Sequence, residues 1–144
     1  MPYATSEHIQ SEFKDLDLSK NTKITPEEVR RFIEETDAEI NSVVGLIYAV
    51  PVTGTESVKF LRTICIDIVV DRIKFILGVK SGVEEADQGE GGSRADKARE
   101  RLGKIPKKEL ILTDAEAARS GGAVSSYNVS AGVEHNFKRN VPQW

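Results

Sequence analysis

Hydrophobic and polar residues follow a helical period from residue 25 to residue 47. Thr25, Pro26 and Glu28 supply the signals of a helix start: an N-cap, a preset first-turn dihedral and a capping-box partner. Charged residues lie on one side, and Pro51 ends the pattern. On the other side, mainly apolar residues recur three and four positions apart. They form one buried stripe of Val29, Phe32, Ile33, Thr36, Ile40, Val43, Val44 and Ile47. The pattern predicts a long amphipathic helix.

The next predicted helix, from about Thr55 to Leu77, is apolar on nearly every side. A helix of this kind is covered on several sides, either at the centre of a bundle or between a bundle and a neighbouring subunit. Because one small domain offers few helices to cover it, the pattern favours an oligomer. A shorter first helix is predicted from a cap at Thr5 or Ser6 to about Phe13.

Beyond the third helix the chain becomes rich in glycine and acidic residues, which predicts a flexible loop at about 80–93. A basic fourth helix is predicted from Arg94 to Leu102, and a short apolar patch surrounds Pro106. These elements predict an all-α fold, a small bundle of three to four helices within residues 1–112.

The last part of the chain, residues 113–144, has too few large apolar side chains to fold alone, because ordering each residue costs conformational entropy. Its aromatic residues concentrate toward the end, whereas a purely solvating tail holds few. We therefore predict an extended C-terminal arm that becomes ordered on a partner. The expected partner-binding residues are Tyr127, Val133, Phe137, Arg139, Val141 and Trp144. A terminal tail without a role is the alternative.

Composition narrows the classes of function. The 144 residues include 20 Lys and Arg against 23 Asp and Glu, and clustered basic residues supply most non-specific affinity for nucleic acid. Cys65, the only cysteine, lies in an apolar run and is expected to be a buried free thiol. His8 and His135 form no metal-ligand spacing. No run is long and apolar enough to cross a membrane, so we expect a soluble cytoplasmic product without a cofactor.

Residues 17–28 follow the spacing of a calcium-binding loop, with Asp17, Asn21 and Glu28 at ligand positions. Thr22 stands where the pattern requires glycine, and with two carboxylates in the loop the affinity would be weak. Glu28 is equally explained as the capping-box residue of the following helix. A small calcium-responsive binding module built on this loop is therefore an alternative function.

Asp67, Asp71 and Arg72 interrupt the most apolar helix in the chain. Asp67 and Asp71 lie one turn apart, and a carboxylate pair can perform acid–base chemistry when burial separates its pKa values. Arg72 favours ion pairing, within the bundle or across a subunit boundary, so all three are candidate subunit-interface residues. No catalytic constellation is predicted, and we expect no enzyme. A nucleic-acid accessory role through the basic segment 94–108 is a further alternative.

Several short motifs occur in order along the chain: Met1 to Thr5, Ala38 to Ile40 leading to Ile47 to Pro51, Cys65 to Ile68 followed by Arg72, and Phe137 to Asn140. An Asp-containing turn, residues 17–25, precedes the second helix. In this order the motifs resemble the neck proteins of Mu-like tailed phages, related to the helical head-tail connectors (adaptors) that bind the portal ring.

The resemblance implies a structural subunit of the virion neck, assembled in the host cytoplasm. It implies a homo-oligomeric ring of about twelve subunits on the portal protein, in contact with tail-side neck proteins. The C-terminal arm would reach the portal or a neighbouring subunit. DNA would pass through the ring without specific binding, which suits the net charge of −3.

Overall fold

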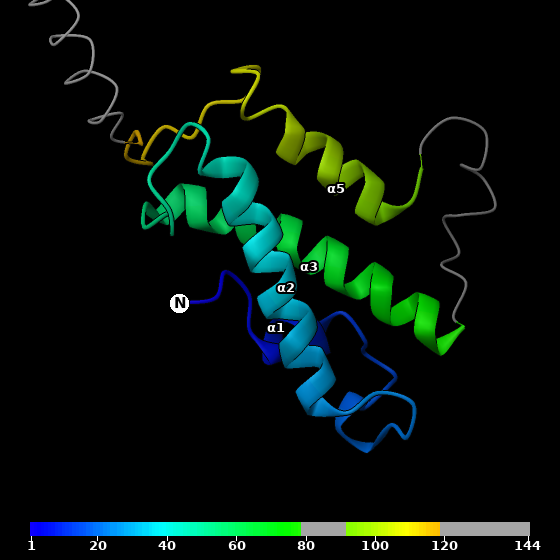
Figure 1. Cartoon of the computed structure of the whole chain (residues 1–144). Helices are drawn as coiled ribbons and strands as arrows, with labels where there is room; N and C mark the ends of the chain where they lie inside the picture. The colour runs from blue at the N-terminus through cyan, green and yellow to red at the C-terminus, as the bar shows by residue number, and fades with distance from the viewer. Residues whose placement is uncertain (79–91, 119–144) are drawn as a thin grey trace, which may run out of the picture.

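The computed structural model describes residues 1–78 and 92–118, and within them the fold is an all-α bundle, as predicted (Figure 1). Its helices are α1 (Ser6–Ser11), α2 (Pro26–Val44), α3 (Thr55–Leu77) and α5 (Arg94–Gly103). A short 3₁₀ helix, η1 (Leu18–Lys20), lies between α1 and α2. The described residues contain one isolated antiparallel bridge and no longer strand pairing.

Capping side chains set the start of three helices. Thr25 accepts from the backbone N–H of Glu28, whose carboxylate accepts in return from the N–H of Thr25, so the predicted capping box of α2 is confirmed. Thr5 caps α1 in the same manner through His8. Ser93 and Asp96 form a third capping box at the start of α5. These local signals explain why the predicted helix starts match the structure.

The end of α2 differs from its hydrophobic pattern. The helix ends at Val44, although the apolar stripe continues to Ile47. Beyond the helix, the carbonyl of Ile47 and the N–H of Ala49 bond to residues 118 and 116 near the C-terminal side of the described chain. A distant segment therefore takes the backbone groups that another turn of helix would need.

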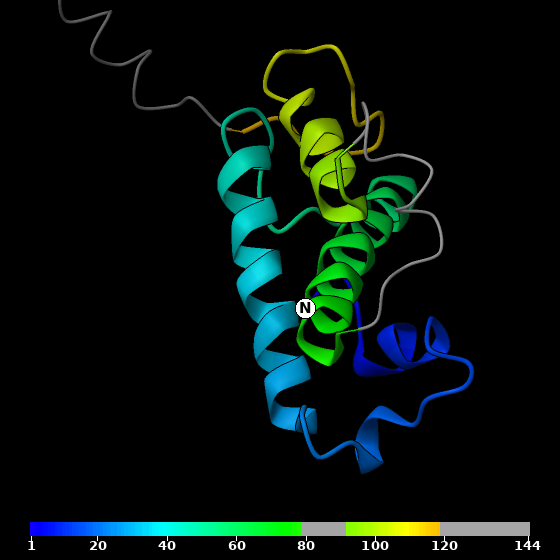
Figure 2. The same cartoon turned by 90° about the vertical axis from the view of Figure 1, so that its right-hand side faces the viewer.

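Helix α3 is the centre of the bundle, packing against α1, α2 and α5 (Figures 1 and 2). The described chain buries Leu61, Ile64, Val69 and Ile73 completely. The sequence pattern had favoured neighbouring subunits as the cover for α3. The structure covers most of this helix with the chain's own helices, which was the other expected possibility, and exposed apolar surface is concentrated in its last turn. The oligomer stays a prediction.

Ion pairs join α5 to the rest of the bundle. Arg94 donates to Asp67 of α3 at 2.7 Å and to Glu12, just beyond α1, at 3.1 Å. Arg99 donates to Glu39 of α2 at 2.7 Å. The residues after α5, through position 118, then return toward the end of the bundle where α2 stops and α3 starts (Figure 1).

None of the helices in the described parts of the chain has the length and apolar character needed to cross a membrane.

Candidate interaction surfaces

Tyr3 fastens the N-terminal segment between α2 and α3. Its backbone N–H lies 3.3 Å from both carboxylate oxygens of Asp37, and its hydroxyl donates to Asn41 Oδ1 at 2.6 Å. The same hydroxyl accepts from the N–H of Val52 at 3.0 Å, and the carbonyl of Tyr3 accepts from Arg62 Nε at 3.0 Å. One buried residue thus connects the N-terminus, α2, the connection between α2 and α3, and α3 itself.

Cys65, next to this hydrogen-bond network, is a fully buried free thiol, as the sequence predicted. Its Sγ is 3.6 Å from Asp37 Oδ1. Burial, followed by the nearby Asp37 charge, raises the pKa of the thiol. Burial likewise raises the pKa of Asp37. A thiol held in its neutral form under cover is a poor nucleophile, so this site is structural.

The N-terminus of α3 receives its cap from a residue far along the chain. The N-cap Gly54 has no side chain to offer, and Asp114 takes its place. The carboxylate of Asp114 accepts from the N–H of Glu56 at 2.7 Å and of Ser57 at 3.0 Å, and also from the Ser57 hydroxyl. The bond from that hydroxyl is the main reason that the pKa of Asp114 is lowered. We call these contacts the Asp114 clasp.

A short backbone pairing completes the attachment. Tyr48 forms an antiparallel bridge with Ala117, and its hydroxyl accepts from the N–H of Leu112 at 3.1 Å. Ala49 N–H donates to the carbonyl of Glu116, and Ala118 N–H donates to that of Ile47, both at 2.8 Å. Residues 113–118, the start of the predicted arm, therefore lie against the helical body.

The predicted partner-binding residues lie beyond this attachment and outside the described residues: Tyr127, Val133, Phe137, Arg139, Val141 and Trp144. The predicted loop at 80–93 also falls almost entirely outside them. Both remain predictions.

The last turn of α3 exposes large apolar side chains. Phe75 is 88% exposed and Ile76 is 40% exposed. Phe75 lines a groove of about 390 Å³ between α2, α3 and α5. The other residues lining it are Glu35, Thr36, Glu39, Ile68, Asp71, Arg72, Ala95 and Arg99. We call this surface the Phe75 face.

Of the three predicted interface residues, Asp71 and Arg72 line this groove, whereas Asp67 does not. Asp67 is 8% exposed and is used within the chain by its bond to Arg94. Arg72 bonds Glu35 at 2.6 Å and places its guanidinium 4.1 Å from the centre of the Phe32 ring. Asp67 and Arg72 thus each form an ion pair within the subunit, Asp67 with Arg94 and Arg72 with Glu35, which is the first of the two arrangements expected for them.

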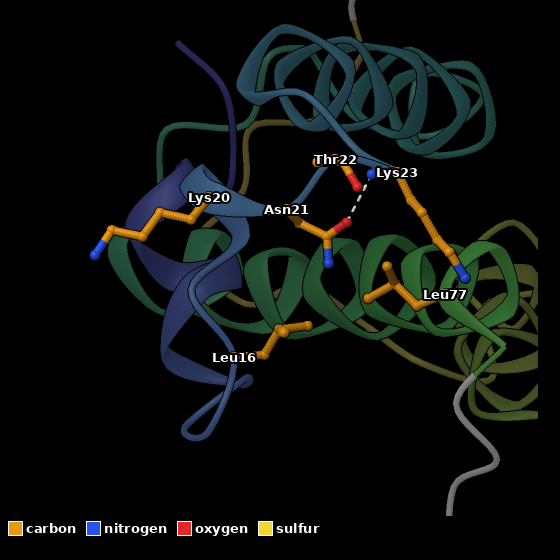
Figure 3. A pocket seen from close by; sticks show the side chains of 6 residues that line it. All are labelled: Leu16, Lys20, Asn21, Thr22, Lys23 and Leu77. Atoms are coloured by element: carbon orange, nitrogen blue, oxygen red, sulfur yellow. Dashed lines mark hydrogen bonds between the residues drawn. The ribbon is translucent and has the colours of Figure 1, made fainter.

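A hollow of about 360 Å³ lies at the C-terminal end of α3, on the side opposite the Phe75 face. Its lining residues are Leu16, Lys20, Asn21, Thr22, Lys23 and Leu77. Figure 3 shows the side chains of Leu16, Asn21 and Leu77 directed toward the same space, with Lys23 extending past Leu77 and Lys20 pointing away. We call it the Leu77 hollow.

The residues proposed for calcium use their oxygens in local bonds. Asp17 Oδ1 accepts from Ser19, Asn21 Oδ1 accepts from the N–H of Lys23, and Glu28 serves the capping box of α2. Within residues 1–78 and 92–118, no group of three or more His, Cys, Asp or Glu side chains is arranged to hold a metal ion. The calcium-responsive module stays a prediction.

Sequence reasoning missed the Asp114 clasp and the Leu77 hollow. A faint signal for the clasp was present, because glycine at an N-cap leaves the first N–H groups of a helix in need of an external acceptor. The hollow had no such signal, since Leu16 and Leu77 come together only in the folded chain.

Comparisons of the chain with protein-family models, curated proteins and solved structures gave no match.

Proposed function

We propose that this chain is a structural head-tail connector subunit of a tailed phage, which forms an oligomeric ring on the portal. Its helical body would build the ring wall, and its C-terminal arm would dock on the portal or on a neighbouring subunit. The ring would pass DNA and attach the tail. The mild negative charge suits passage of DNA without adhesion.

The observation that carries the proposal is the meeting of the connector-like motifs at Tyr3. Tyr3 belongs to the first motif, Asp37 and Asn41 flank the second, Val52 follows Pro51, and Cys65 opens the third. Residues in or beside motifs that are distant in sequence thus form one partly buried hydrogen-bond network. Their meeting in one network supports the interpretation that the motifs belong to a single pattern.

The Asp114 clasp adds a second support. An arm that must reach a partner works best from a fixed origin, because a fixed origin limits the volume that its end explores. Asp114 and the pairing at Ala117 hold the chain against the body until residue 118. The arm residues that follow would then start from one defined corner of the subunit.

The test is electron microscopy of the purified chain mixed with portal rings of the same phage. We expect an added ring of density on the portal. Deletion of residues 137–144 should leave the helical circular-dichroism signal unchanged and abolish the added ring, because the deleted residues include the predicted aromatic anchors. Bare portal rings with the full chain, or undiminished rings with the deletion, would overturn the proposal.

A further inference from the structure

Two different surfaces lie on opposite sides of one helix end. An α-helix turns about 100° per residue, so Phe75 and Leu77, two positions apart, are separated by about 200° of rotation and point to nearly opposite sides. Phe75 marks the Phe75 face, and Leu77 lines the Leu77 hollow. A projection and a hollow at one level on opposite sides are the elements of a head-to-tail contact between identical subunits.

The exposure of Phe75 is the strongest sign of a missing neighbour. An aromatic ring carries a large apolar area, and at 88% exposure nearly all of it meets water. Ile76 beside it is 40% exposed. Apolar residues scattered singly are ordinary on a surface, but these two are adjacent, and Phe75 also lines the groove.

The charges around the two surfaces are complementary. The Phe75 face carries three carboxylates, Glu35, Glu39 and Asp71, against the two guanidinium groups of Arg72 and Arg99. The Leu77 hollow has two lysines and no acidic residue in its lining. Opposite net charges steer one surface toward the other and disfavour contacts between like surfaces.

On each side, one charged residue forms no ion pair within 4.0 Å among the described residues, although the charge of Asp71 also acts on nearby Arg99. Among the residues that the structure describes, Glu35 and Glu39 pair with arginines, while Asp71 forms none of the ion pairs within 4.0 Å. Lys20 pairs with Asp17, whereas Lys23 forms none of these pairs either. Asp71 lies one turn before Phe75 on the same side of α3, and Lys23 extends past Leu77 (Figure 3).

We propose that Phe75 and Ile76 of one subunit dock in the Leu77 hollow of a second copy, with Asp71 of the first facing Lys23 of the second. The hollow, about 360 Å³, falls in the range of roughly 300 to 1,000 Å³ over which pockets hold ligands. The contact is heterologous, so repetition closes a ring when the rotation between copies permits. It rests on the proposed ring-forming function and assigns the lateral contact within that ring.

Disulfide trapping in the full-length chain tests the contact. Phe75→Cys and Thr22→Cys are separate variants at exposed positions, one on each surface. Mixed under oxidation, they should give a covalent dimer containing one of each. The matched control mixes Phe75→Cys with Ile111→Cys, because Ile111 is also exposed, at 67%, and belongs to neither surface. Cross-linking to the control as strong as to Thr22→Cys, or Phe75→Cys dimers alone, would overturn the contact.

Exchange of the two charges provides a second test of the contact. Asp71→Lys added to the Phe75→Cys chain, or Lys23→Glu added to the Thr22→Cys chain, should lower the yield of the mixed disulfide several-fold. Combining both changed chains should restore it, because the pair is then reversed and still opposite. Reduced yield without restoration would contradict the Asp71–Lys23 pairing.

The two proposals fail in different ways. Rings on the portal without the Phe75–Thr22 cross-link would overturn this lateral contact and leave the connector function standing. A specific cross-link from a chain that never joins the portal would support the contact and count against the connector function.

Discussion

The two ends of α3 differ in how far other parts of the chain cap and cover them. At the first end, Asp114 supplies the missing cap and residues 112–118 pack against the connection between α2 and α3. At the second end, Phe75 is mostly exposed and lines a groove, and Ile76 is partly exposed. A single helix therefore has one end capped by its own chain and one end with exposed apolar side chains. The first end stabilises the subunit, whereas the second is the surface that we propose for contact between subunits.

The largest expected effect lies in the covered part of α3. Leu61 is fully buried, so Leu61→Ala should lower the free energy of unfolding by about 2 to 5 kcal/mol through lost burial and a cavity. Urea unfolding followed by circular dichroism measures this as a lower midpoint with an unchanged slope. A loss below 1 kcal/mol, on the order of a surface substitution, would show that this segment is less well packed than its burial indicates.

The next effect concerns the ion pair that holds α5 to α3. Arg94→Ala leaves the largely buried carboxylate of Asp67 without its partner and should cost about 1 to 2 kcal/mol. The value stays at the lower end because Arg94 is partly exposed and solvent screens the pair. The same urea measurement tests it. Asp67→Asn in the Arg94→Ala background should recover part of the loss, and an additive further loss would argue against this pairing.

The Asp114 clasp should respond to pH. The pKa of Asp114 is lowered in the folded chain, so its stabilising contribution is present above the unfolded-state pKa and is lost as pH falls through the folded one. Amide hydrogen exchange at Glu56, Ser57 and residues 116–118, corrected for intrinsic rates, should accelerate in acid. Asp114→Asn should remove this pH dependence, and an unchanged acid profile in that variant would exclude Asp114 as its source.

A companion variant tests the clasp without changing any charge. Gly54 lies against Asp114 so closely that an added Cβ would overlap its carboxylate and carbonyl. Gly54→Ala should therefore displace residues 112–118 and speed hydrogen exchange in that segment while α5 remains protected. Equal acceleration in α5 would indicate general unfolding, contrary to a local clasp.

The smallest effect on stability is expected at the exposed end. Phe75→Ala removes a side chain that meets mostly water, so the free energy of unfolding should change by less than about 0.5 kcal/mol. Sedimentation of the same variant with portal rings should nevertheless show weakened assembly if the Phe75 face joins subunits. A stability loss near that of Leu61→Ala would erase the contrast between the two ends of the helix.

The sequence predicted the helices better than it predicted their surroundings. Thr25, Pro26 and Glu28 act within one turn, and the apolar character of residues 55–77 needs no other segment to be recognised. The end of α2 was misjudged because residues 116 and 118 compete for the backbone after Val44. The sequence predicted part of the candidate surface. Asp71 and Arg72 line the groove, whereas Asp67 bonds to Arg94.

Local chemistry in the sequence thus determined the starts of the helices, the all-α class and the presence of a central helix apolar on nearly every side. Tertiary structure decided which chain segments cover that helix, because Asp114, Arg94 and Tyr3 act on partners far from them in sequence. Tertiary structure alone also left Phe75 uncovered and formed the hollow beside Leu77. Caps and periodicity are encoded within a few residues, whereas cover and exposure depend on how distant segments share space.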